Sequence, residues 1–367
     1  MSEKKQKIVF VIPSLGSGGA ERVVSTLASE LSKRDYETAV MMIANDHLNY
    51  PLSDKVERIH LNCEQRHNGQ NVLKRTIGRV RDIRAAIKKS GADVVISFMS
   101  DTNIDVCFAA WSLKVPVIVS ERNDPAIDPA SRAKQWMRKL AYCRADGFVF
   151  QTPDAQAYFN KKIQKKSCII LNPLTSLIPE VYEGQREKRI VAVGRLNKQK
   201  NFPLLIGAFA EFVKKEPEYI LEIYGEGSLE NDIRKNIEQK CLQEQVILKG
   251  FCKDVHEKIR SAAFFVMTSD FEGMPNALIE AMALGLPCIS TDCPCGGPRM
   301  LIQPGENGLL FPVRNEEALL EAMHKMVSDP EAAAAMGKNA CAIKEKVQLD
   351  GVTDQWIRYI QKICGEY

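Results

Sequence analysis

Two carboxylates mark the stretch of the chain best suited to chemistry, Glu272 and Glu280 in FEGMPNALIEAMALGLP. Glu280 is the only ionisable residue between Gly273 and Leu286. Because burial of an unpaired carboxylate is costly, the apolar run around Glu280 indicates that a ligand satisfies its charge and that it faces a cleft. Eight helical residues span about 12 Å, whereas the acid and base of a glycosidase lie about 5–9.5 Å apart. We therefore expect two separate contacts with one extended ligand.

The turn between the two glutamates should begin a helix. Pro275 suits the first helical position, which makes Met274 the expected N-cap, and Gly285 followed by Pro287 ends the helix. Amide groups at such a helix start lack helical acceptors and can bind phosphate or sugar oxygens. These amides belong to Gly273, Met274, Asn276 and Ala277.

Two other turns carry residue types that bind phosphate. VAVGRLNKQKN contains Arg195, whose guanidinium binds phosphate as a fork, and Lys200, whose ammonium acts as a point charge. VIPSLGSGGAERVV contains Gly16, Gly18 and Gly19, which let the backbone approach a ligand before a helix begins. The glycine spacing matches neither the dinucleotide fingerprint nor a P-loop. A plain turn and solvated loop charges remain the alternatives for these two segments taken alone.

The elements that position these residues alternate between short apolar strands and amphipathic helices, which implies parallel sheets covered on both faces. Expected strands lie at 8–12, 38–43, 94–98, 115–119, 147–150, 168–171, 189–193, 220–224, 246–248, 263–267, 287–290 and 308–311. Expected helices lie at 20–33, 71–89, 102–112, 130–143, 154–160, 202–215, 228–240, 254–261, 275–284, 315–328, 331–346 and 353–364. Residues 171–188 should form a linker. The pattern predicts an α/β fold of two doubly wound, Rossmann-like domains, 1–175 and 186–350, facing a central cleft, with ligands beyond the carboxyl ends of the strands.

Composition places the chain among soluble globular proteins, with 45% hydrophobic and 26% charged residues. No apolar run reaches the roughly 18–20 residues of a membrane-spanning helix, and the N-terminus reads as a first strand rather than a signal peptide. The 11 cysteines show no CxxC pair and no Cys/His zinc spacing, so we expect reduced cytosolic thiols. The five histidines should be structural or surface residues that form no cluster. We expect neither a metal site nor a nucleic-acid partner.

The net charge of +4 is unevenly distributed along the chain. Residues 1–172 carry 27 basic and 18 acidic side chains, whereas residues 173–367 carry 23 and 28. A basic half of this kind indicates an anionic partner.

The strongest basic segment is the helix expected at 71–89, with seven Lys or Arg and one Asp. Lys74, Arg81 and Lys88 recur every seven residues and line one face over about 21 Å. Another face carries Leu73, Ile77, Val80 and Ile87. The segment 131–144 adds Trp136 and Tyr142 among five cations. Such a surface suits peripheral attachment to anionic lipid; the alternative is a core-packed helix with a solvated charged face.

In this order and at these separations, GSGGAER, VGRLNKQKN and FEGMPNALIEAMALGLP resemble family 4 glycosyltransferases of the GT-B fold, over essentially the whole chain. IYGEGSLENDIR and GLLFPVRNEEAL fit the donor domain of that family. The basic helix, VVISFMSDTNIDV and VIVSERNDP are similar to bacterial N-acetylgalactosaminyltransferases that extend undecaprenyl-diphosphate-linked glycans. VTDQWIRYIQKI resembles the family's C-terminal helix, so residues 351–367 should cross back to the N-terminal domain.

The resemblance implies a catalytic group and a donor site. Glu272, Arg195 and Lys200 would be catalytic, with Arg195 and Lys200 stabilising the departing diphosphate and Glu272 holding the transferred sugar. Glu280 would bind the ribose hydroxyls. The remaining expected donor contacts are Gly18, Gly19, Phe251, Gly273, Met274, Pro275 and Asn276. Members of the family retain anomeric configuration without an obvious protein nucleophile and generally need no metal, so no cofactor is expected. Related chains often carry an acidic residue at the position of Met300. Any role that this acidic residue has in the family therefore has no equivalent residue in this chain.

The resemblance also implies an acceptor site on the basic half. Lys74, Arg81 and Lys88 would bind a lipid diphosphate. Nearer the acceptor hydroxyl would lie Asp101, Asn103, Glu121 and Arg122. The expected function is transfer of a hexose or N-acetylhexosamine from a UDP-sugar to an undecaprenyl-diphosphate-linked glycan, by a protein peripherally bound to the cytoplasmic face of the membrane. Such a reaction would serve the assembly of cell-surface polysaccharide or of glycoprotein glycans.

Two other classes remain as alternatives. A nucleotide-sugar epimerase of the same fold would need acid–base carboxylates and histidines in the cleft, and the histidines are sparse. A non-catalytic two-domain sugar-binding protein of the periplasmic type is disfavoured by the absence of a signal sequence and by the free cysteines.

Overall fold

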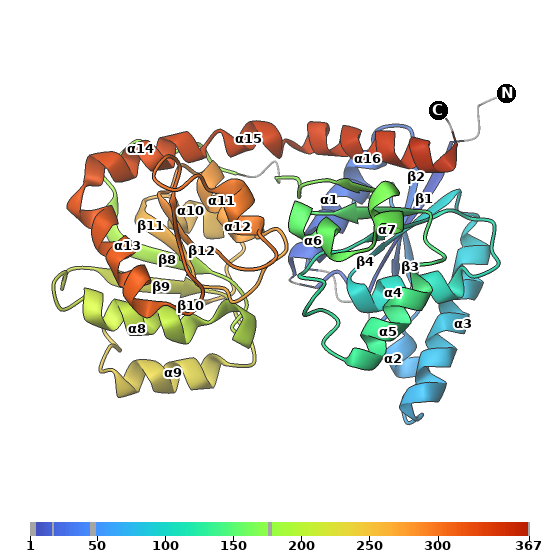
Figure 1. The fold of residues 1–367 in the computed structure, drawn as a ribbon, viewed down its shortest axis with the longest axis horizontal. Helices are drawn as coiled ribbons and strands as arrows, with labels where there is room; N and C mark the ends of the chain where they lie inside the picture. Colours follow the sequence, from blue (N-terminus) through green and yellow to red (C-terminus); the bar gives the residue numbers. More distant parts are fainter. Residues whose placement is uncertain (1–4, 17, 45–48, 175–177, 366–367) are drawn as a thin grey trace. The chain divides into compact units, whose positions relative to one another are not determined.

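The computed structural model describes residues 5–16, 18–44, 49–174 and 178–365. The chain divides into two compact units, coloured along the sequence in Figure 1. Unit 1 comprises Met1–Pro173 together with Gln348–Tyr367, and unit 2 comprises Leu174–Val347. The change of unit falls within the segment expected as a linker. Positions 175–177 of that segment, and Ser17 of the glycine-rich turn, lie outside the described residues.

Unit 1 is built on a seven-stranded parallel sheet in the order β3-β2-β1-β4-β5-β6-β7. Its strands are β1 (Lys7–Ile12), β2 (Glu37–Met42), β3 (Glu57–His60), β4 (Val94–Phe98), β5 (Val117–Ser120), β6 (Gly147–Phe150) and β7 (Ser167–Ile169). The central strand β1 pairs with β2 on one side and with β4 on the other. The order reverses there, and in doubly wound sheets ligands bind at this switch point.

Helices cover both faces of this sheet (Figure 1). They are α1 (Gly19–Leu31), α2 (Cys63–Arg66), α3 (Val72–Ser90), α4 (Ser100–Ala109), α5 (Arg132–Ala141), α6 (Pro153–Tyr158), α7 (Lys161–Lys165) and the C-terminal α16 (Leu349–Cys364). Helix α4 packs against both α3 and α5, whereas α16 packs against α1.

The C-terminal helix is part of the core of unit 1. Trp356 of α16 is buried and stacks on Phe98 of β4, with ring centroids 5.9 Å apart. The Tyr359 hydroxyl accepts a 2.7 Å hydrogen bond from the Phe148 amide of β6 and donates one to the Lys166 carbonyl. The last helix of the chain therefore completes the domain that the first strand begins.

Unit 2 repeats the design with a six-stranded parallel sheet in the order β10-β9-β8-β11-β12-β13. Its strands are β8 (Glu187–Val193), β9 (Ile220–Tyr224), β10 (Val246–Gly250), β11 (Ala262–Met267), β12 (Cys288–Thr291) and β13 (Leu309–Phe311). Its helices are η1 (Lys198–Lys200), α8 (Phe202–Phe212), α9 (Glu230–Gln239), α10 (Val255–Ile259), α11 (Asn276–Ala283), α12 (Gly297–Leu301), α13 (Glu316–Ser328), α14 (Pro330–Ala340) and α15 (Ile343–Lys346). Helix α8 packs against α9 and α13, and α11 against α10, α14 and α15.

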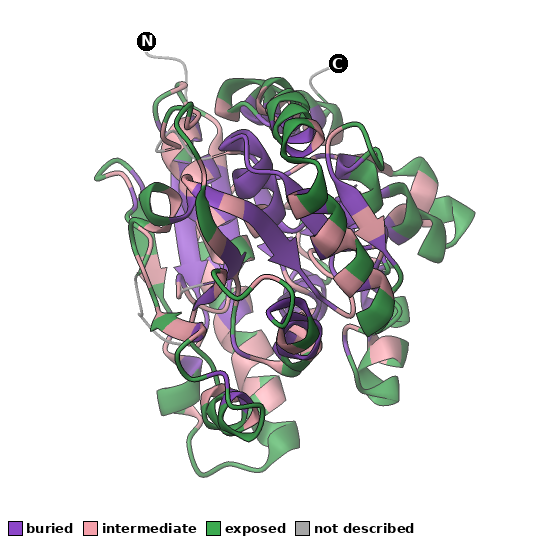
Figure 2. Ribbon diagram, turned by 90° about the vertical axis from the view of Figure 1, so that its left-hand side faces the viewer, coloured by how far each residue is buried: buried purple, intermediate pink, exposed green. Residues whose placement is uncertain are grey.

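Burial follows the layers of each unit. Figure 2 shows buried residues along the strands and exposed residues on the outer surfaces of the helices. In β1 every residue after Lys7 is buried, as expected for a central parallel strand with both faces covered. Together, the two sheets confirm the predicted α/β fold of two Rossmann-like domains.

The secondary structure differs from expectation in a few places. Strand β3 was not predicted, because ERIH offers one apolar residue in four and forms an exposed sheet edge. The helix expected over 331–346 divides into α14 and α15 around Cys341 and Ala342. The short elements α2, α7, α12 and η1 were also missed, since three to five residues show little periodicity.

Candidate active site

Two loops at the carboxyl end of the unit 2 sheet are joined by hydrogen bonds. One loop follows β8 and the other follows β11, its neighbour in the sheet. The Gln199 side chain donates to the Phe271 carbonyl over 2.9 Å, and the Asp270 amide donates to the Gln199 carbonyl over 2.8 Å. Thr268 donates to the Lys200 carbonyl over 2.9 Å. These bonds fix the predicted diphosphate-binding segment against the FEGMP segment.

Lys200 and Glu272 are brought together within this pair of loops. Lys200 Nζ donates to Glu272 Oε1 over 2.5 Å, and both side chains are largely buried. The backbone of Glu272 exchanges hydrogen bonds with the β12–α12 loop, at the Pro294 carbonyl and the Cys295 amide. Cys293 and Cys295 are buried in this loop, so the Cys-Pro-Cys segment is part of the support of Glu272.

Glycine is required where these loops approach one another. A Cβ on Gly297 would lie 1.8 Å from the Gly273 carbonyl oxygen. A Cβ on Gly225, whose φ is +138°, would lie 2.0 Å from the Gly194 carbonyl oxygen. Side chains at either position would separate the loops that carry the candidate site.

Arg195 lies on the same β8 loop as Lys200 but is exposed. The loop also holds Asn201, whose side chain donates to Asp270 over 2.9 Å. Arg314 forms a 2.6 Å ion pair with the other oxygen of Asp270. Arg314 lies in the GLLFPVRNEEAL segment, but the sequence assigned no role to it or to Asp270, because their contact joins two separate loops.

Helix α11 begins one residue later than predicted. Pro275 has extended backbone angles, φ −79° and ψ 102°, and is the N-cap, so Met274 precedes the cap. The proline ring fixes φ but leaves ψ free, and extended ψ is what an N-cap requires. Gly273, Met274 and Pro275 are buried, and Asn276 is partly exposed.

Glu280 is buried on α11 and has a protein partner that the sequence reasoning missed. His256 Nε2 of α10 lies 2.8 Å from Glu280 Oε2, and both side chains are largely buried. This contact is compatible with the expected structural role of His256, whereas the expectation that no histidine joins a cluster is wrong for His67, which lies beside Cys63 and Asp82. A carboxylate has about four acceptor positions and can accept several hydrogen bonds at once.

Phe251 directly follows β10, the strand at one edge of the unit 2 sheet. Its side chain is 48% exposed, which is unusual for phenylalanine and leaves an aromatic face accessible. Its amide lies 3.4 Å from Glu226 Oε1, on the loop after β9. Phe251 therefore lies in the row of loops that also holds Lys200 and Glu272.

Gly18 and Gly19 belong to unit 1. Gly18 is buried and caps α1, and Gly19 is the exposed first residue of that helix. A Cβ on Gly18 would lie 2.0 Å from a carboxylate oxygen of Glu21, which folds over the turn. The loop thus forms the expected strand–turn–helix junction after β1, at the switch point of the sheet.

The expected acceptor residues Asn103 and Glu121 lie in one buried network of unit 1. Tyr142 donates a short hydrogen bond to Glu121 Oε1, and Ser100 donates to Glu121 Oε2 over 2.9 Å. Ser100 Oγ also lies 3.2 Å from Asp128 Oδ2, and Asn103 Nδ2 lies 3.4 Å from the Tyr142 hydroxyl. Burial raises the pKa of Glu121, and burial with nearby acidic charge raises that of Asp128.

Asp128 and Tyr142 belong to this buried network but were not among the predicted acceptor residues. Tyr142 is buried, so the expectation that it joins an exposed basic and aromatic surface is wrong, whereas Trp136 is 67% exposed. Asp101 is exposed and pairs with Lys134 over 2.5 Å, outside the buried network.

Arg122 lies in the loop after β5, next to the stacked rings of Phe98 and Trp356. Its guanidinium carbon lies 4.2 Å from the Phe98 ring centroid and 5.8 Å from that of Trp356. Nη1 donates to Asn172 over 2.7 Å. Burial lowers the pKa of Arg122 to about 9.

The basic helix is α3, on which Lys74, Arg81 and Lys88 are all exposed. Its apolar residues divide into two halves. Ile83 and Ile87 are buried in unit 1, whereas Leu73 is 70% and Ile77 42% exposed. The four apolar residues predicted to share one face therefore do not share one environment. None of the described helices is long and apolar enough to cross a membrane.

Comparison with known proteins identifies the class. Residues 18–165 match the family model "Glycosyl transferase 4-like domain" and residues 177–342 match "Glycosyl transferases group 1". Sucrose-phosphate synthase from Thermosynechococcus elongatus superposes with a TM-score of 0.85 at 17% identity, covering 99% of this chain and all of the other. HepE of Anabaena, solved in complex with UDP, gives a TM-score of 0.80 at 17% identity, with 97% and 100% coverage. The two sheets therefore form a GT-B fold, and the chain is an enzyme of the glycosyltransferase class.

Sequence relatives extend along almost the whole chain. The GalNAc-alpha-(1->4)-GalNAc-alpha-(1->3)-diNAcBac-PP-undecaprenol alpha-1,4-N-acetyl-D-galactosaminyltransferase of Campylobacter jejuni is 26% identical, covering 97% of this chain and 99% of the relative. The N-acetylgalactosamine-N,N'-diacetylbacillosaminyl-diphospho-undecaprenol 4-alpha-N-acetylgalactosaminyltransferase of the same organism is 29% identical, with 91% and 94% coverage. With the two family models matching most of its length, the chain belongs to the family 4 glycosyltransferases, as the motifs predicted.

Proposed function

We propose that the protein is a retaining glycosyltransferase that moves a hexose or N-acetylhexosamine from a UDP-sugar to an undecaprenyl-diphosphate-linked glycan. The observation that carries the donor half of this proposal is the Lys200–Glu272 pair at the carboxyl ends of β8 and β11. It places a cation and a carboxylate where doubly wound domains bind nucleotides. Solved structures of the same fold hold UDP, among them HepE with UDP and glucose.

The transfer step needs stabilisation of negative charge on the leaving diphosphate. Lys200 has three N–H donors, so it can keep Glu272 and still donate to a phosphate oxygen. Arg195 is exposed on the same loop and is able to add a bidentate contact. Charges held in place before the reaction stabilise the transition state most effectively, and on this proposal they perform the role that a divalent ion performs elsewhere. The proposed transfer is therefore metal-independent.

Glu272 would bind hydroxyls of the transferred sugar, together with Gly273, Met274 and Asn276 at the start of α11. Glu280 would bind the ribose, with His256 holding its carboxylate in place. Phe251 offers an exposed ring on which a base could stack.

The acceptor half of the proposal rests on α3 and on the relatives. Two Campylobacter jejuni relatives and the UDP-Gal:alpha-D-GlcNAc-diphosphoundecaprenol alpha-1,3-galactosyltransferase of Escherichia coli are named for undecaprenyl-linked acceptors. A lipid diphosphate is anionic, and α3 exposes Lys74, Arg81 and Lys88 to it. The exposed Leu73 and Ile77 would enter the cytoplasmic leaflet, which makes the protein peripheral.

The test is a transfer assay with a panel of UDP-sugars and synthetic undecaprenyl- or polyprenyl-diphosphate glycans, followed by mass spectrometry and determination of the anomeric configuration. We expect one UDP-sugar to yield a product one sugar heavier, with retained configuration and unchanged turnover after EDTA treatment. Inversion would overturn the retaining step. Interconversion of UDP-sugars without transfer would instead support an epimerase.

A further inference from the structure

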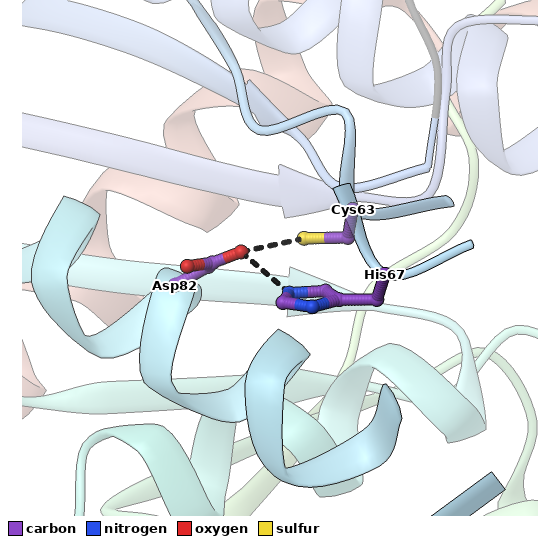
Figure 3. A group of neighbouring side chains, drawn as sticks. All are labelled: Cys63, His67 and Asp82. Atoms are coloured by element: carbon purple, nitrogen blue, oxygen red, sulfur yellow. Dashed lines mark hydrogen bonds and ion pairs between the residues drawn. The ribbon is translucent and has the colours of Figure 1, made fainter. Parts of the chain in front are cut away.

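A compact group of potential metal ligands lies in unit 1, on the α2 turn and on α3. Cys63 is the first residue of α2, His67 is its C-cap, and Asp82 lies one helix away on α3. Figure 3 shows the three side chains converging, with the thiol and the imidazole both directed at one carboxylate oxygen. Their ligand atoms all lie within 4.8 Å of one another. A soft sulfur, an imidazole nitrogen and a carboxylate oxygen form a donor set typical of zinc.

The distances are close to those that a tetrahedral ion requires. Zinc bonds of about 2.0–2.3 Å place sulfur and oxygen ligands about 3.6 Å apart, and nitrogen and oxygen ligands about 3.4 Å apart. Cys63 Sγ lies 3.7 Å from Asp82 Oδ2, and His67 Nε2 lies 2.8 Å from the same oxygen. The Cys63–Asp82 distance therefore fits a shared ion, whereas His67 Nε2 and Asp82 Oδ2 would have to move apart by about 0.6 Å.

The position of His67 is determined by an unusual residue in α3. Gly78 lies inside the helix, where glycine costs about 0.5–1 kcal/mol relative to alanine. A Cβ on Gly78 would lie 2.5 Å from His67 Cε1 and 2.9 Å from His67 Nε2. Because Gly78 has no side chain, the His67 imidazole can lie against α3 at this position and reach Asp82. Cys63 is buried and the other two side chains are largely buried, so all three are held within the fold.

Charge also favours a divalent cation at this position. A Cys63 thiolate and the Asp82 carboxylate would together carry two negative charges, which one Zn²⁺ neutralises. Arg66 Nη1 lies 3.3 Å from Asp82 Oδ2, but its side chain is 58% exposed and can move to the other carboxylate oxygen.

We propose that Cys63, His67 and Asp82 bind one zinc ion that fixes the α2 turn to the middle of α3, with water as the fourth ligand. Binding exchanges the thiol proton of Cys63 for the metal, and the proton passes to solvent. The site is structural, and it lies on the helix that also presents Lys74 and Arg81. The donor residues proposed above lie on other elements, whereas Asp82 shares α3 with the proposed acceptor residues Lys74, Arg81 and Lys88. The competing arrangement is an ion-free His67–Asp82 hydrogen bond with a neighbouring thiol.

The test uses the full chain, treated with chelator, reduced, and titrated with Co²⁺ and then with Zn²⁺. We expect about one equivalent of Co²⁺ to give thiolate-to-cobalt charge-transfer absorption with the visible bands of a tetrahedral ion, and Zn²⁺ to displace it. Cys63→Ser and His67→Gln should each weaken binding at least about 10–100-fold, and Cys63→Ser should abolish the charge-transfer band. Cys168→Ser and His60→Gln are matched controls in the same unit and should bind as the unmodified chain does.

A second measurement needs no variant. The rate of alkylation of each cysteine is followed by mass spectrometry with and without Zn²⁺. Zn²⁺ should slow the alkylation of Cys63 and should leave that of the exposed Cys143 unchanged. Absence of charge-transfer absorption in the unmodified chain would overturn the proposal. Retention of the band in Cys63→Ser, or alkylation of Cys63 at the same rate with and without Zn²⁺, would overturn it as well.

Discussion

Lys200 and Glu272 are 72 residues apart in the chain, yet Lys200 Nζ and Glu272 Oε1 lie 2.5 Å apart. The pair joins the loops of two adjacent parallel strands, β8 and β11, at the same edge of the sheet. A largely buried ion pair adds little stability relative to apolar residues of the same size, because desolvation offsets its attraction. We therefore interpret the pair as a functional unit that holds a cation ready for the leaving group of the donor.

The first prediction concerns this unit. Lys200→Met and Glu272→Gln should each lower kcat about 10²–10³-fold, the loss found when one preorganised charge contact of a transition state is removed. Because the two side chains act together, the double variant should lose much less than the product of the two single losses. Steady-state kinetics with the best UDP-sugar measures all three. Lys214→Met with Glu211→Gln removes an exposed pair of the same type and should leave kcat unchanged. Full turnover in both single variants would show that the donor site lies elsewhere.

The second prediction separates ribose binding from transfer. Glu280→Gln should raise the KM for the UDP-sugar about 10–100-fold, since hydrogen bonds to a charged group contribute about 1.5–3 kcal/mol. The change in kcat should be much smaller, because the ribose keeps its charge distribution during the reaction. His256→Ala should raise the same KM by removing the hydrogen bond that His256 makes with Glu280, and His256→Gln, which can still donate, should recover most of the loss. A fall in kcat with an unchanged KM would contradict the assignment of Glu280 to the ribose.

The fold was largely predictable because most of its strands are short, mainly apolar runs separated by amphipathic helices. The strands predicted at 94–98, 147–150 and 220–224 have the bounds of β4, β6 and β9. Strand β3 was missed because an edge strand needs few apolar residues, and Glu57, Arg58 and His60 leave only Ile59 to indicate it.

The candidate site was predictable only in part. Glu272, Lys200 and Glu280 were predicted because they lie in motifs of the family. The contact between His256 and Glu280 and the contact between His67 and Asp82 were not predicted. Each contact joins two separate helices or turns, and the sequence does not show how such elements pack. The sequence also did not show which apolar residues of α3 are exposed and which are buried. Helical periodicity predicts the apolar face of a helix, but not how far along that face another element packs against it.

The third prediction concerns the acceptor surface. Replacing Lys74, Arg81 and Lys88 together with alanine should raise the KM for a polyprenyl-diphosphate acceptor at least tenfold and leave donor binding unchanged. The loss should shrink at high salt, where exposed charges are screened. The matched control replaces Lys161, Lys162 and Lys165, three exposed lysines of α7 in the same unit. Equal acceptor kinetics in the two triple variants would show that net charge, rather than the α3 row, determines acceptor use.

The last prediction tests how the unit 2 sheet supports the site. Glu222 of β9 is buried beside Arg189 Nη1 at 2.6 Å, Lys249 Nζ at 3.0 Å and the Tyr224 hydroxyl at 2.8 Å. Burial alone would raise the pKa of Glu222, but hydrogen bonds from Lys249, Tyr224 and Arg189 outweigh it, so the pKa is lowered. A carboxylate whose pKa is lower in the folded state stabilises the protein above its unfolded pKa, and this stability is lost as pH falls through the folded value.

Glu222→Gln should therefore lower the free energy of unfolding by about 1–2 kcal/mol at pH 7. The difference from the unmodified chain should shrink as pH falls below about 4.3, the ordinary glutamate value. Urea unfolding at several pH values measures it. Glu218→Gln, which removes an exposed pair with Lys188, should change little at any pH because surface pairs contribute about 0–1 kcal/mol. A Glu222→Gln deficit that stays constant down to pH 3 would show that Glu222 acts through packing rather than through its charge.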